Sequence, residues 1–433
     1  MLNRFQQMYN SKKITVEQAL GLIRSGDEIV AGFCGLEPMA VLSRLHTIKD
    51  RVEDVTVWFS LGMGKYEFFT NPELKNHFHT KSWFYSGGIR SAHSLGTVSY
   101  QPGHLHNAMT RKLQVSCPRV FIGTATPMDR HGYVKVSLSV LYEKEFIEKA
   151  DLVIMEINPR LPNVGGDTEI HIRDIDYVIE VDRPIPELPP SEVTEVERTI
   201  GAYVASLVND GDTIQLGIGA IPNAVAQPFM DKHDLGVHTE MITTSMADLA
   251  EAGVITGRKK TLHRGKIVGT FALGSQKLYD FLDENPSVIL MRGPYVNDPY
   301  VIAQNDNMVS INTALQVDLT GQVCSESIGT QHYSGTGGQT DTAVGAIHAK
   351  NGRSIIAVYS TAKGGTISTI QPWLSPGAAV TLQRNNVDYV VTEYGIACLK
   401  ARTIRERVEN LIAVAHPDFR AELRETAFKH EIW

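Results

Sequence analysis

Cysteine is scarce in this sequence, with four among 433 residues. Cys34, Cys117, Cys324 and Cys398 stand far apart and form no C-x-x-C pair. A disulfide framework or a zinc site uses paired or closely spaced cysteines. The sequence therefore indicates neither of these, and we expect each cysteine to be a buried free thiol.

Long basic runs and long apolar runs are lacking as well. The formal net charge is −7, and no Lys/Arg-rich stretch is available to neutralise phosphates, which argues against nucleic acid as a partner. The longest apolar runs, such as DLVIMEI, fall far short of the roughly 20 residues of a membrane-spanning helix. The polar N-terminus has no apolar signal-peptide core. We expect no membrane association and a cytoplasmic location.

The apolar residues that are present suit more than one core. Hydrophobic residues make up 42% of a chain too long for one small domain. Strand-like runs such as VFIGTAT and DLVIMEIN alternate with helix-like segments, the pattern of an α/β fold with covered sheet faces. Residues 182–197 are rich in proline and acidic residues and read as a linker. We predict an N-terminal α/β domain at 1–188 and a C-terminal one at 189–433.

A β-loop-α pattern occurs once in each half of the chain. Placing Gly26 on Gly211 gives an offset of 185 residues (211 − 26), and in this alignment Asp27 meets Asp212 and Gly32 meets Gly217. We interpret the match as an internal duplication that yields two related open α/β domains. The alternative, two unrelated turns that share a common Gly-Asp start, stays open because such short matches are frequent.

One carboxylate, Glu240, lies in the chain between two glycine turns. QLGIGAIPNAV precedes it and SGTGGQTD follows it. Closely spaced backbone N–H groups of such turns can bind anions or a developing oxyanion. An isolated glutamate is usually a solvated residue, and a lone glycine turn is usually structural. The combination suggests a nucleophile between two anion-binding loops.

Several long motifs carry a family resemblance. GIGAIPNAV, HTEM, DLTGQVCSESIGTQHYSGTGGQTD, STAKGGTIS, VVTEYGIA and AHPDFR follow one another in order. Together they resemble the acetyl-CoA hydrolase/transferase group of family I CoA-transferases, especially those acting on 4-hydroxybutyryl-CoA and butyryl-CoA. The resemblance covers essentially the whole chain. It implies a homodimer or higher homo-oligomer of two-domain α/β subunits with the active site at the domain junction.

The resemblance also implies a covalent mechanism. The residue that matches the family's nucleophile is Glu240, which would attack an acyl-CoA thioester and later carry CoA as a glutamyl-CoA thioester. Coenzyme A is then a substrate and covalent intermediate, and no permanently bound cofactor is expected. The expected partners are acyl-CoA and carboxylic acids, with acetate on one side and a four- or five-carbon acid on the other.

The binding residues follow from the same motifs. By resemblance, oxyanion and CoA binding fall to Gly217, Ile218, Gly219, Ala220, Ile221, Leu315, Gly337, Gly338, Ser360 and Lys363. Each glycine loop could instead be a tight turn that simply requires glycine. Lys363 could equally be an exposed surface lysine.

Other candidates have weaker support. Glu37, Arg90 and Thr342 are predicted to line an acyl pocket, although Glu37 and Arg90 could each form a structural ion pair. Glu326 is a second carboxylate that we expect to orient the site. The pairs His77/His79 and His104/His106 have a spacing that two metal ligands can share, but no third ligand is evident, so no metal site is predicted.

Departures from the family pattern concern the acyl group. The chain has ITTS after HTEM where relatives have ISDG, Thr342 where they have phenylalanine, and Thr369 where arginine is frequent. Small polar replacements favour a longer, branched or polar acyl chain.

We favour a CoA-transferase over two other functions. An acyl-CoA hydrolase would differ only in the access of water to the glutamyl thioester. A non-catalytic ligand-sensing module is an alternative of another class, but the sequence has no helix-turn-helix appendage and retains the nucleophile.

Overall fold

A computed structural model describes residues 3–189, 192–217 and 219–433. The chain forms two compact units. The first comprises Met1–Leu188 and Gly269–Tyr295, and the second comprises Pro189–Val268 and Val296–Trp433. The chain therefore returns to the first unit once, whereas the predicted limits 1–188 and 189–433 contain no such return. Among the described residues, no helix has the length and apolar character needed to cross a membrane.

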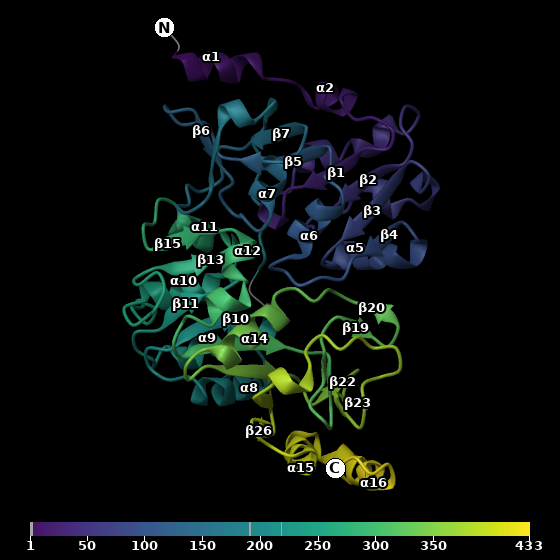
Figure 1. Cartoon of the computed structure of the whole chain (residues 1–433), viewed down its shortest axis with the longest axis vertical. Coiled ribbons are helices and arrows are strands. Elements are labelled where there is room, and N and C mark those ends of the chain that lie inside the picture. The colour runs from purple at the N-terminus through teal and green to yellow at the C-terminus, as the bar shows by residue number, and fades with distance from the viewer. Residues whose placement is uncertain (1–2, 190–191, 218) are drawn as a thin grey trace. The chain divides into compact units, whose positions relative to one another are not determined.

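The first unit is built on a seven-stranded sheet in the order β4-β3-β2-β1-β5-β7-β9 (Figure 1). Its strands are β1 (Glu28–Ala31), β2 (Val55–Trp58), β3 (Phe78–Ser82), β4 (Val98–Tyr100), β5 (Val120–Ala125), β7 (Leu152–Ile157) and β9 (Tyr177–Glu180). All neighbours are parallel. β2, β5 and β7 are buried along their whole length, as expected for a parallel sheet covered on both faces.

Short helices surround this sheet and connect its strands. They are α1 (Arg4–Ser11), α2 (Val16–Gly21), α3 (Met39–Leu42), α4 (Glu67–Thr70), α5 (Gly87–Ala92), α6 (Ala108–Val115) and α7 (Glu143–Ile147). β6 (Tyr133–Lys135) and β8 (Glu169–His171) form a separate antiparallel pair. The returning segment adds β14 (Phe271–Ala272), α11 (Gln276–Leu282), β15 (Val288–Leu290) and α12 (Gly293–Val296).

The second unit repeats this winding with its own parallel sheet. Its strands follow the order β13-β11-β10-β16-β21-β25-β26, and the last is antiparallel to its neighbour. They are β10 (Thr213–Leu216), β11 (Gly236–His238), β13 (Ile267–Gly269), β16 (Met308–Thr313), β21 (Arg353–Ala357), β25 (Tyr389–Thr392) and β26 (Gly395–Cys398). In both units the earliest strand is central and the order reverses beside it, which creates a topological switch point where ligands bind in such sheets.

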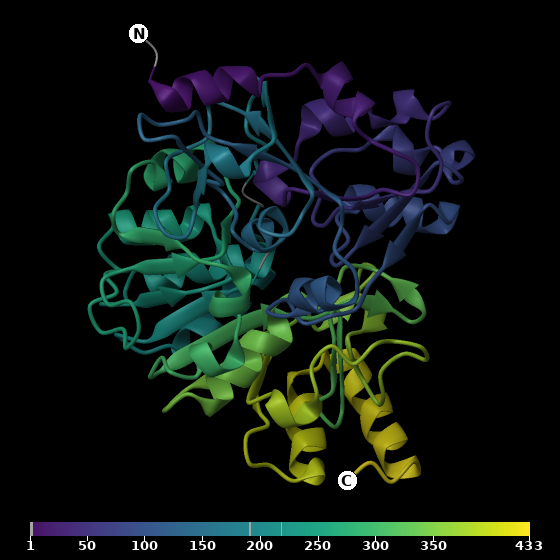
Figure 2. The same ribbon diagram turned by 45° about the horizontal axis from the view of Figure 1, so that its top comes forward.

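Helices and small sheets complete the second unit. The helices are α8 (Glu195–Ser206), α9 (Ala220–Phe229), α10 (Thr244–Glu251), α13 (Pro299–Ile302), α14 (Gln339–His348), α15 (Ile404–Val414) and α16 (Arg420–Lys429). The short strands are β12 (Met241–Ile242), β17 (Gln316–Asp318), β18 (Val323–Cys324), β19 (Ser327–Ile328), β20 (Gln331–His332), β22 (Thr361–Ala362), β23 (Ile367–Ser368) and β24 (Ile370–Gln371). Both views show α15 and α16 as neighbouring helices near the C-terminus (Figures 1 and 2).

The predicted duplication is visible in the backbone. β1 and β10 begin at Glu28 and Thr213, which are 185 positions apart (213 − 28). Gly26 and Gly211 precede them with φ of 76° and 80°, a left-handed conformation that favours glycine. The two β-loop-α units are therefore related in conformation as well as in sequence.

The aspartate of each Gly-Asp pair has the same role. The carboxylate of Asp27 accepts the backbone N–H of Arg24 and pairs with the guanidinium of Arg119 at 2.5 Å. The carboxylate of Asp212 likewise accepts the N–H of Asn209 at 2.6 Å and pairs with Arg353. Each aspartate closes the turn before the central strand, which explains why the pair recurs.

The sequence MITTSMADLAEAG predicts a single helix, which is wrong at its start, because Met241–Ile242 is a strand and α10 begins at Thr244. The periodicity of TIRERVENLIAVA predicts that Val408, Leu411, Ile412 and Val414 pack inward, and all four are buried on α15. The same periodicity predicts that Arg407 faces water, whereas its guanidinium donates to the carbonyl oxygens of Thr320 and Arg384.

Candidate active site

Glu240 lies two residues beyond β11, at the carboxyl end of a strand next to the central strand of the second sheet. Strand pairing extends up to it, because the N–H of Thr239 donates to the carbonyl oxygen of Val268 at 3.0 Å. Thr239 is buried, while Glu240 keeps partial exposure. The fold thus presents this carboxylate from a rigid strand end rather than from a flexible loop.

Two residues that are distant in the sequence hold the Glu240 carboxylate. Asn297, which follows α12 and is fully buried, donates its Nδ2 to Oε2 of Glu240 at 3.4 Å. The backbone N–H of Gly338, the residue before α14, also donates to this carboxylate. A Cβ at position 338 would overlap Oε2 of Glu240 and Nδ2 of Asn297. Glycine is therefore required here for close approach.

The surroundings raise the pKa of Glu240 to about 7. Burial is the largest cause, and the negative charge of Asp341 adds to it. The hydrogen bonds from Asn297 and Gly338 act in the opposite direction because they stabilise the anion. At neutral pH the carboxyl is therefore partly ionised, and its anion is more basic than that of a solvated glutamate, a property that suits a nucleophile.

His238 supports the strand end as a neutral group. Its Nε2 donates to the carbonyl oxygen of Val296 at 2.8 Å, and burial with the nearby Lys260 charge lowers its pKa to about 3. Its Nδ1 is buried and has no partner among the described residues. Lys260 is itself buried, has its pKa lowered to about 7 by burial, and donates to the carbonyl oxygens of Val237 and Lys266.

The loop after β10 supplies backbone N–H groups at the switch point. Gly217 uses its own N–H within the sheet, donating to Ile311 O at 2.9 Å, so this group is already satisfied. Gly219 has φ of +125° and open space where a Cβ would lie, which lets a ligand approach the backbone. Ala220 and Ile221 begin α9, where N–H groups lack helical partners. Ile218 lies outside the described residues.

A buried polar network lies under this loop. Gln215, Ser310, Asn312 and Thr342 join β10, β16 and α14 through side-chain hydrogen bonds of 2.9 to 3.3 Å. Thr342 accepts from Ser310 and Asn312 and is 2% exposed. This placement offers no support for the predicted acyl-pocket role of Thr342.

The residues predicted on the CoA side follow β16 and β21. Leu315 is partly exposed, and its N–H donates to Cys324 O at 2.9 Å. Ser360 is buried and donates both its N–H and its hydroxyl to Glu393, at 3.0 and 2.6 Å. Lys363 lies exposed in the β22–β23 turn with a left-handed φ of 49°. Ser360 therefore anchors the turn on which Lys363 is presented.

The remaining glycine of the second loop, Gly337, precedes Gly338 with φ of +55°. Glu326 is buried, and its Oε2 accepts hydrogen bonds from Thr336 and Thr381 at 3.2 and 2.8 Å. Its carboxylate is thus tied to neighbouring hydroxyl groups, as expected for a supporting rather than an attacking group.

In the first unit, Glu37 is fully buried in the loop after β1. Its carboxylate accepts the N–H groups of Met63 and Gly64 at 2.6 and 3.0 Å and the hydroxyl of Tyr66. Burial raises the pKa of Glu37. Neither an ion pair nor an open pocket is needed to explain it, because these donors fix one loop to another. Arg90 is half-buried on α5.

The histidine pairs have other partners. Nδ1 of His77 contacts Val52 O at 2.9 Å, His79 pairs with Asp54 at 3.1 Å, and the rings of His104 and His106 stack on each other. In the part of the chain that the structure describes, no group of three or more His, Cys, Asp or Glu could hold a metal ion.

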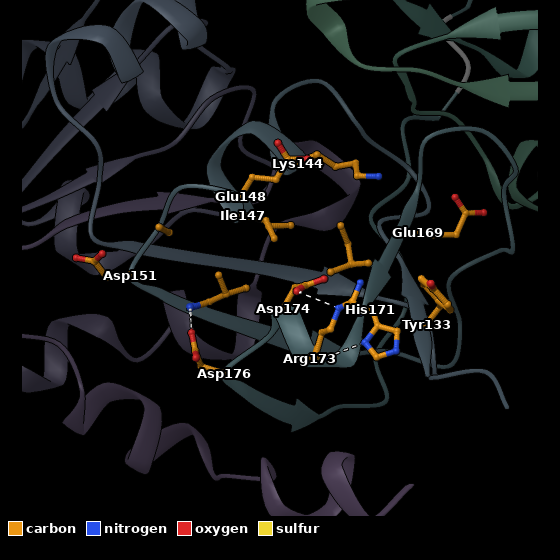
Figure 3. A pocket seen from close by; sticks show the side chains of 13 residues that line it. Tyr133, Lys144, Ile147, Glu148, Asp151, Glu169, His171, Arg173, Asp174 and Asp176 are labelled. Atoms are coloured by element: carbon orange, nitrogen blue, oxygen red, sulfur yellow. Dashed lines mark hydrogen bonds and ion pairs between the residues drawn. The ribbon is translucent and has the colours of Figure 1, made fainter. Parts of the chain in front are cut away.

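A cavity of about 570 Å³ in the first unit contains none of the predicted site residues (Figure 3). Its rim carries several carboxylates, including Glu148, Asp151 and Asp176, and Arg173 points toward Asp174 at 3.5 Å. The charged rim lacks any group prepared for nucleophilic attack, so this cavity is a poor candidate for the active site.

Sequence reasoning missed Asn297, Asp341 and Lys260. Asn297 stands in NDP, which reads as an ordinary helix start, and it meets Glu240 only through the fold. Asp341 belongs to the SGTGGQTD motif, but nothing in the motif reveals the electrostatic effect on Glu240. A buried lysine has no sequence signal at all, since lysine is usually exposed.

The chain is similar to known proteins over its whole length. The acetyl-CoA hydrolase/transferase N-terminal domain matches residues 2–189, and the corresponding C-terminal domain matches residues 274–427. The chain is 44% identical to 4-hydroxybutyrate coenzyme A transferase of Clostridium kluyveri over 97% of this chain and 98% of that protein. It is 42% identical to succinyl-CoA:cyclohexane-1-carboxylate CoA transferase of Geobacter metallireducens over 98% and 96%. The crystal structure of RipA from Yersinia pestis has a TM-score of 0.94 at 36% identity and covers both chains completely.

We predict that the Glu240 carboxyl titrates with a midpoint near pH 7. Carbon NMR of protein labelled at glutamate side chains would follow it, and the Glu240→Gln spectrum would assign the signal. Because the Asp341 charge raises this pKa, Asp341→Asn should move the midpoint to lower pH. A Glu240 signal that titrates near the value of solvated glutamate would contradict the buried environment.

Proposed function

This chain belongs to the acetyl-CoA hydrolase/transferase family, and we propose that it is a CoA-transferase that moves CoA between a short-chain acyl-CoA and a carboxylate such as acetate. The observation that carries this proposal is the Glu240 carboxylate, held by Asn297 and Gly338 with a pKa of about 7 at the end of β11. A four- or five-carbon acid is the proposed second acid, because relatives that are 41–44% identical carry names with 4-hydroxybutyrate and butyrate.

In the first step, a carboxylate oxygen of Glu240 attacks the thioester carbon. Asn297 donates to Oε2, so Oε1 is the proposed attacking oxygen. The carbonyl becomes a tetrahedral oxyanion, the C–S bond then breaks, and CoA leaves as a thiolate. The product on the enzyme is an acyl-glutamyl anhydride.

In the second step, the CoA thiolate attacks the Glu240 carbonyl carbon of the anhydride. The bond between the Glu240 carbonyl carbon and the bridging oxygen breaks. The donor acid leaves as a carboxylate, and a glutamyl-CoA thioester remains. An acceptor acid then runs the two steps in reverse. Taken together, the two steps replace one thioester with another of similar energy, so no ATP is needed.

Both steps pass through an oxyanion that needs hydrogen-bond donors. The N–H groups of Gly219, Ala220 and Ile221 at the start of α9 are the proposed donors, since the N–H of Gly217 is used within the sheet. One well-placed backbone donor contributes about 3 kcal/mol. Lys363 and the N–H groups near it are proposed to meet the phosphates of CoA, and Leu315 its pantetheine arm.

Two further properties are proposed. A homo-oligomer is proposed from the family resemblance alone. A cytoplasmic location is supported by the four cysteines, all of which are free, since disulfides are rare in reducing compartments.

The covalent route predicts ping-pong kinetics. One site holds CoA between two half-reactions, so initial rates at varied acyl-CoA and acceptor acid should give parallel double-reciprocal lines. Intersecting lines would mean direct transfer in a ternary complex.

Glu240→Gln should lower kcat by several orders of magnitude, because it removes the anionic nucleophile while keeping the size of the side chain. Glu240→Asp should lose on the order of a hundredfold, since its carboxylate is displaced by about 1 Å. Wild-type protein incubated with acyl-CoA alone should gain the mass of CoA on the Glu240 peptide.

The control for both variants is Glu195→Gln on the exposed side of α8, which should leave turnover unchanged. A CoA label on Glu326 or Cys324, or normal turnover by Glu240→Gln, would show that another residue is the nucleophile.

Gly338→Ala should lower kcat on the order of a hundredfold with little loss of stability. The backbone φ of −96° accepts alanine, but the new methyl would displace the Glu240 carboxylate and the Asn297 amide. Gly21→Ala makes the same chemical change in open space and is the matched control. Equal kinetics for both variants, with equal melting temperatures, would argue against the placement of Glu240 beside Gly338.

A further inference from the structure

The chain leaves the second unit just after β11 has paired with β13 and returns just before Asn297. We call Gly269–Tyr295 the crossing segment, because it belongs to the first unit. On its entry side, Val268 O accepts the N–H of Thr239 at 3.0 Å. On its exit side, Val296 O accepts Nε2 of His238 at 2.8 Å, and Asn297 donates to Glu240 at 3.4 Å. The residues flanking the crossing segment therefore frame the nucleophile.

The exit of the crossing segment is anchored by Arg292. Its Nε donates to Asp167 Oδ2 at 2.6 Å, and its two terminal nitrogens reach Glu148 at 2.6 and 3.3 Å. Glu145 lies 3.5 Å from the same guanidinium. One cation thus joins three carboxylates: one on α7, one on the residue after α7, and one in the loop before β8. The forked geometry is one that arginine favours.

The ion pairs shift the pKa values of Asp167 and Arg292. Burial alone would raise the pKa of Asp167, but hydrogen bonds from Lys144 and Arg292 outweigh burial and lower it. The hydrogen bond with Glu148, followed by that with Asp167, raises the pKa of Arg292. Arg292 is 30% exposed, so the network is shielded from solvent better than an isolated surface pair.

The residues directly after Arg292 are closely packed and helical. The N–H of Gly293 donates to Val140 O at 3.2 Å, and a Cβ at Gly293 would meet Leu141 O at 2.5 Å. Gly293–Val296 is a helical turn, α12, and Asn297 follows it directly. One helical turn is thus the whole connection between Arg292 and Asn297.

We propose that Arg292 is a positioning residue for the transfer reaction, acting through α12 to keep Val296 against His238 and Asn297 against Glu240. The inference rests on the proposed function, because it presumes that Glu240 is the nucleophile. Arg292 itself touches neither substrate nor the reacting carboxylate. Its contribution is to fix the residue that orients that carboxylate.

A double-mutant cycle tests the inference. The variants are Arg292→Met, which keeps length and removes charge, Asn297→Ala, and the double variant. Arg292→Met should lower kcat on the order of tenfold, because a partial misplacement costs less than a full 1 Å displacement. Its KM for acyl-CoA should change less than about twofold. In the Asn297→Ala background the same change should cost less than about twofold, since the residue it positions is already gone.

The matched control is Arg160→Met, which removes an exposed ion pair of the same unit, with Asp182, and should leave kcat unchanged. If Arg292→Met fails to fold, Asp167→Asn takes its place, because it weakens the same anchor with little change in shape. An equal loss of kcat in both backgrounds would overturn the positioning role while leaving the nucleophile intact. Absence of a CoA label on Glu240 in wild-type protein would instead overturn the proposed function, and this inference with it.

Discussion

The site depends on a single constraint, a carboxyl group that must ionise near neutral pH while largely withdrawn from water. Burial and the charge of Asp341 favour the protonated form of Glu240, and the donors of Asn297 and Gly338 favour the anion. Burial has the largest effect, so the pKa rises to about 7, and under neutral conditions the group is partly ionised and its anion is basic. The need for a donor at van der Waals distance excludes any side chain at position 338. The need for a second donor also explains why the Asn297 amide lies beside Glu240, directly after the crossing segment.

The two units share the same turn, strand and glycine around their central strands, but the loop that follows differs between them. In both units a Gly-Asp turn leads into a central parallel strand, and the next loop begins with a glycine whose N–H donates to the neighbouring strand, Gly32 to Ile122 O and Gly217 to Ile311 O. In the first unit the following loop is closed by buried carboxylates, with Glu143 accepting the N–H of Phe33. In the second unit the loop runs into a ten-residue helix and keeps its first N–H groups for a ligand. The two copies therefore differ in how the loop after the central strand is closed.

Sequence reasoning was successful where the chemistry is local. The Gly-Asp turns, the start of β10 and the buried face of α15 follow from backbone preference and periodicity, which short segments carry by themselves. It failed where residues meet only through the fold. Asn297 is 57 positions from Glu240 (297 − 240), and nothing in the local sequence brings its amide to that carboxylate. The family resemblance singled out Glu240 as a candidate but gave no account of what holds it.

The sequence singles out Thr342 as a small polar residue near the second glycine loop, and its surroundings in the fold account for its hydroxyl. In the fold, the Thr342 hydroxyl accepts from Ser310 and Asn312 inside a network that also includes Gln215. The side chain is matched to buried polar partners, and an unpaired hydroxyl there would cost about 1–3 kcal/mol. The threonine is explained by the network of β10, β16 and α14. The acyl-pocket role of Thr342 stays a prediction, and the network shows that its hydroxyl is already paired within the protein.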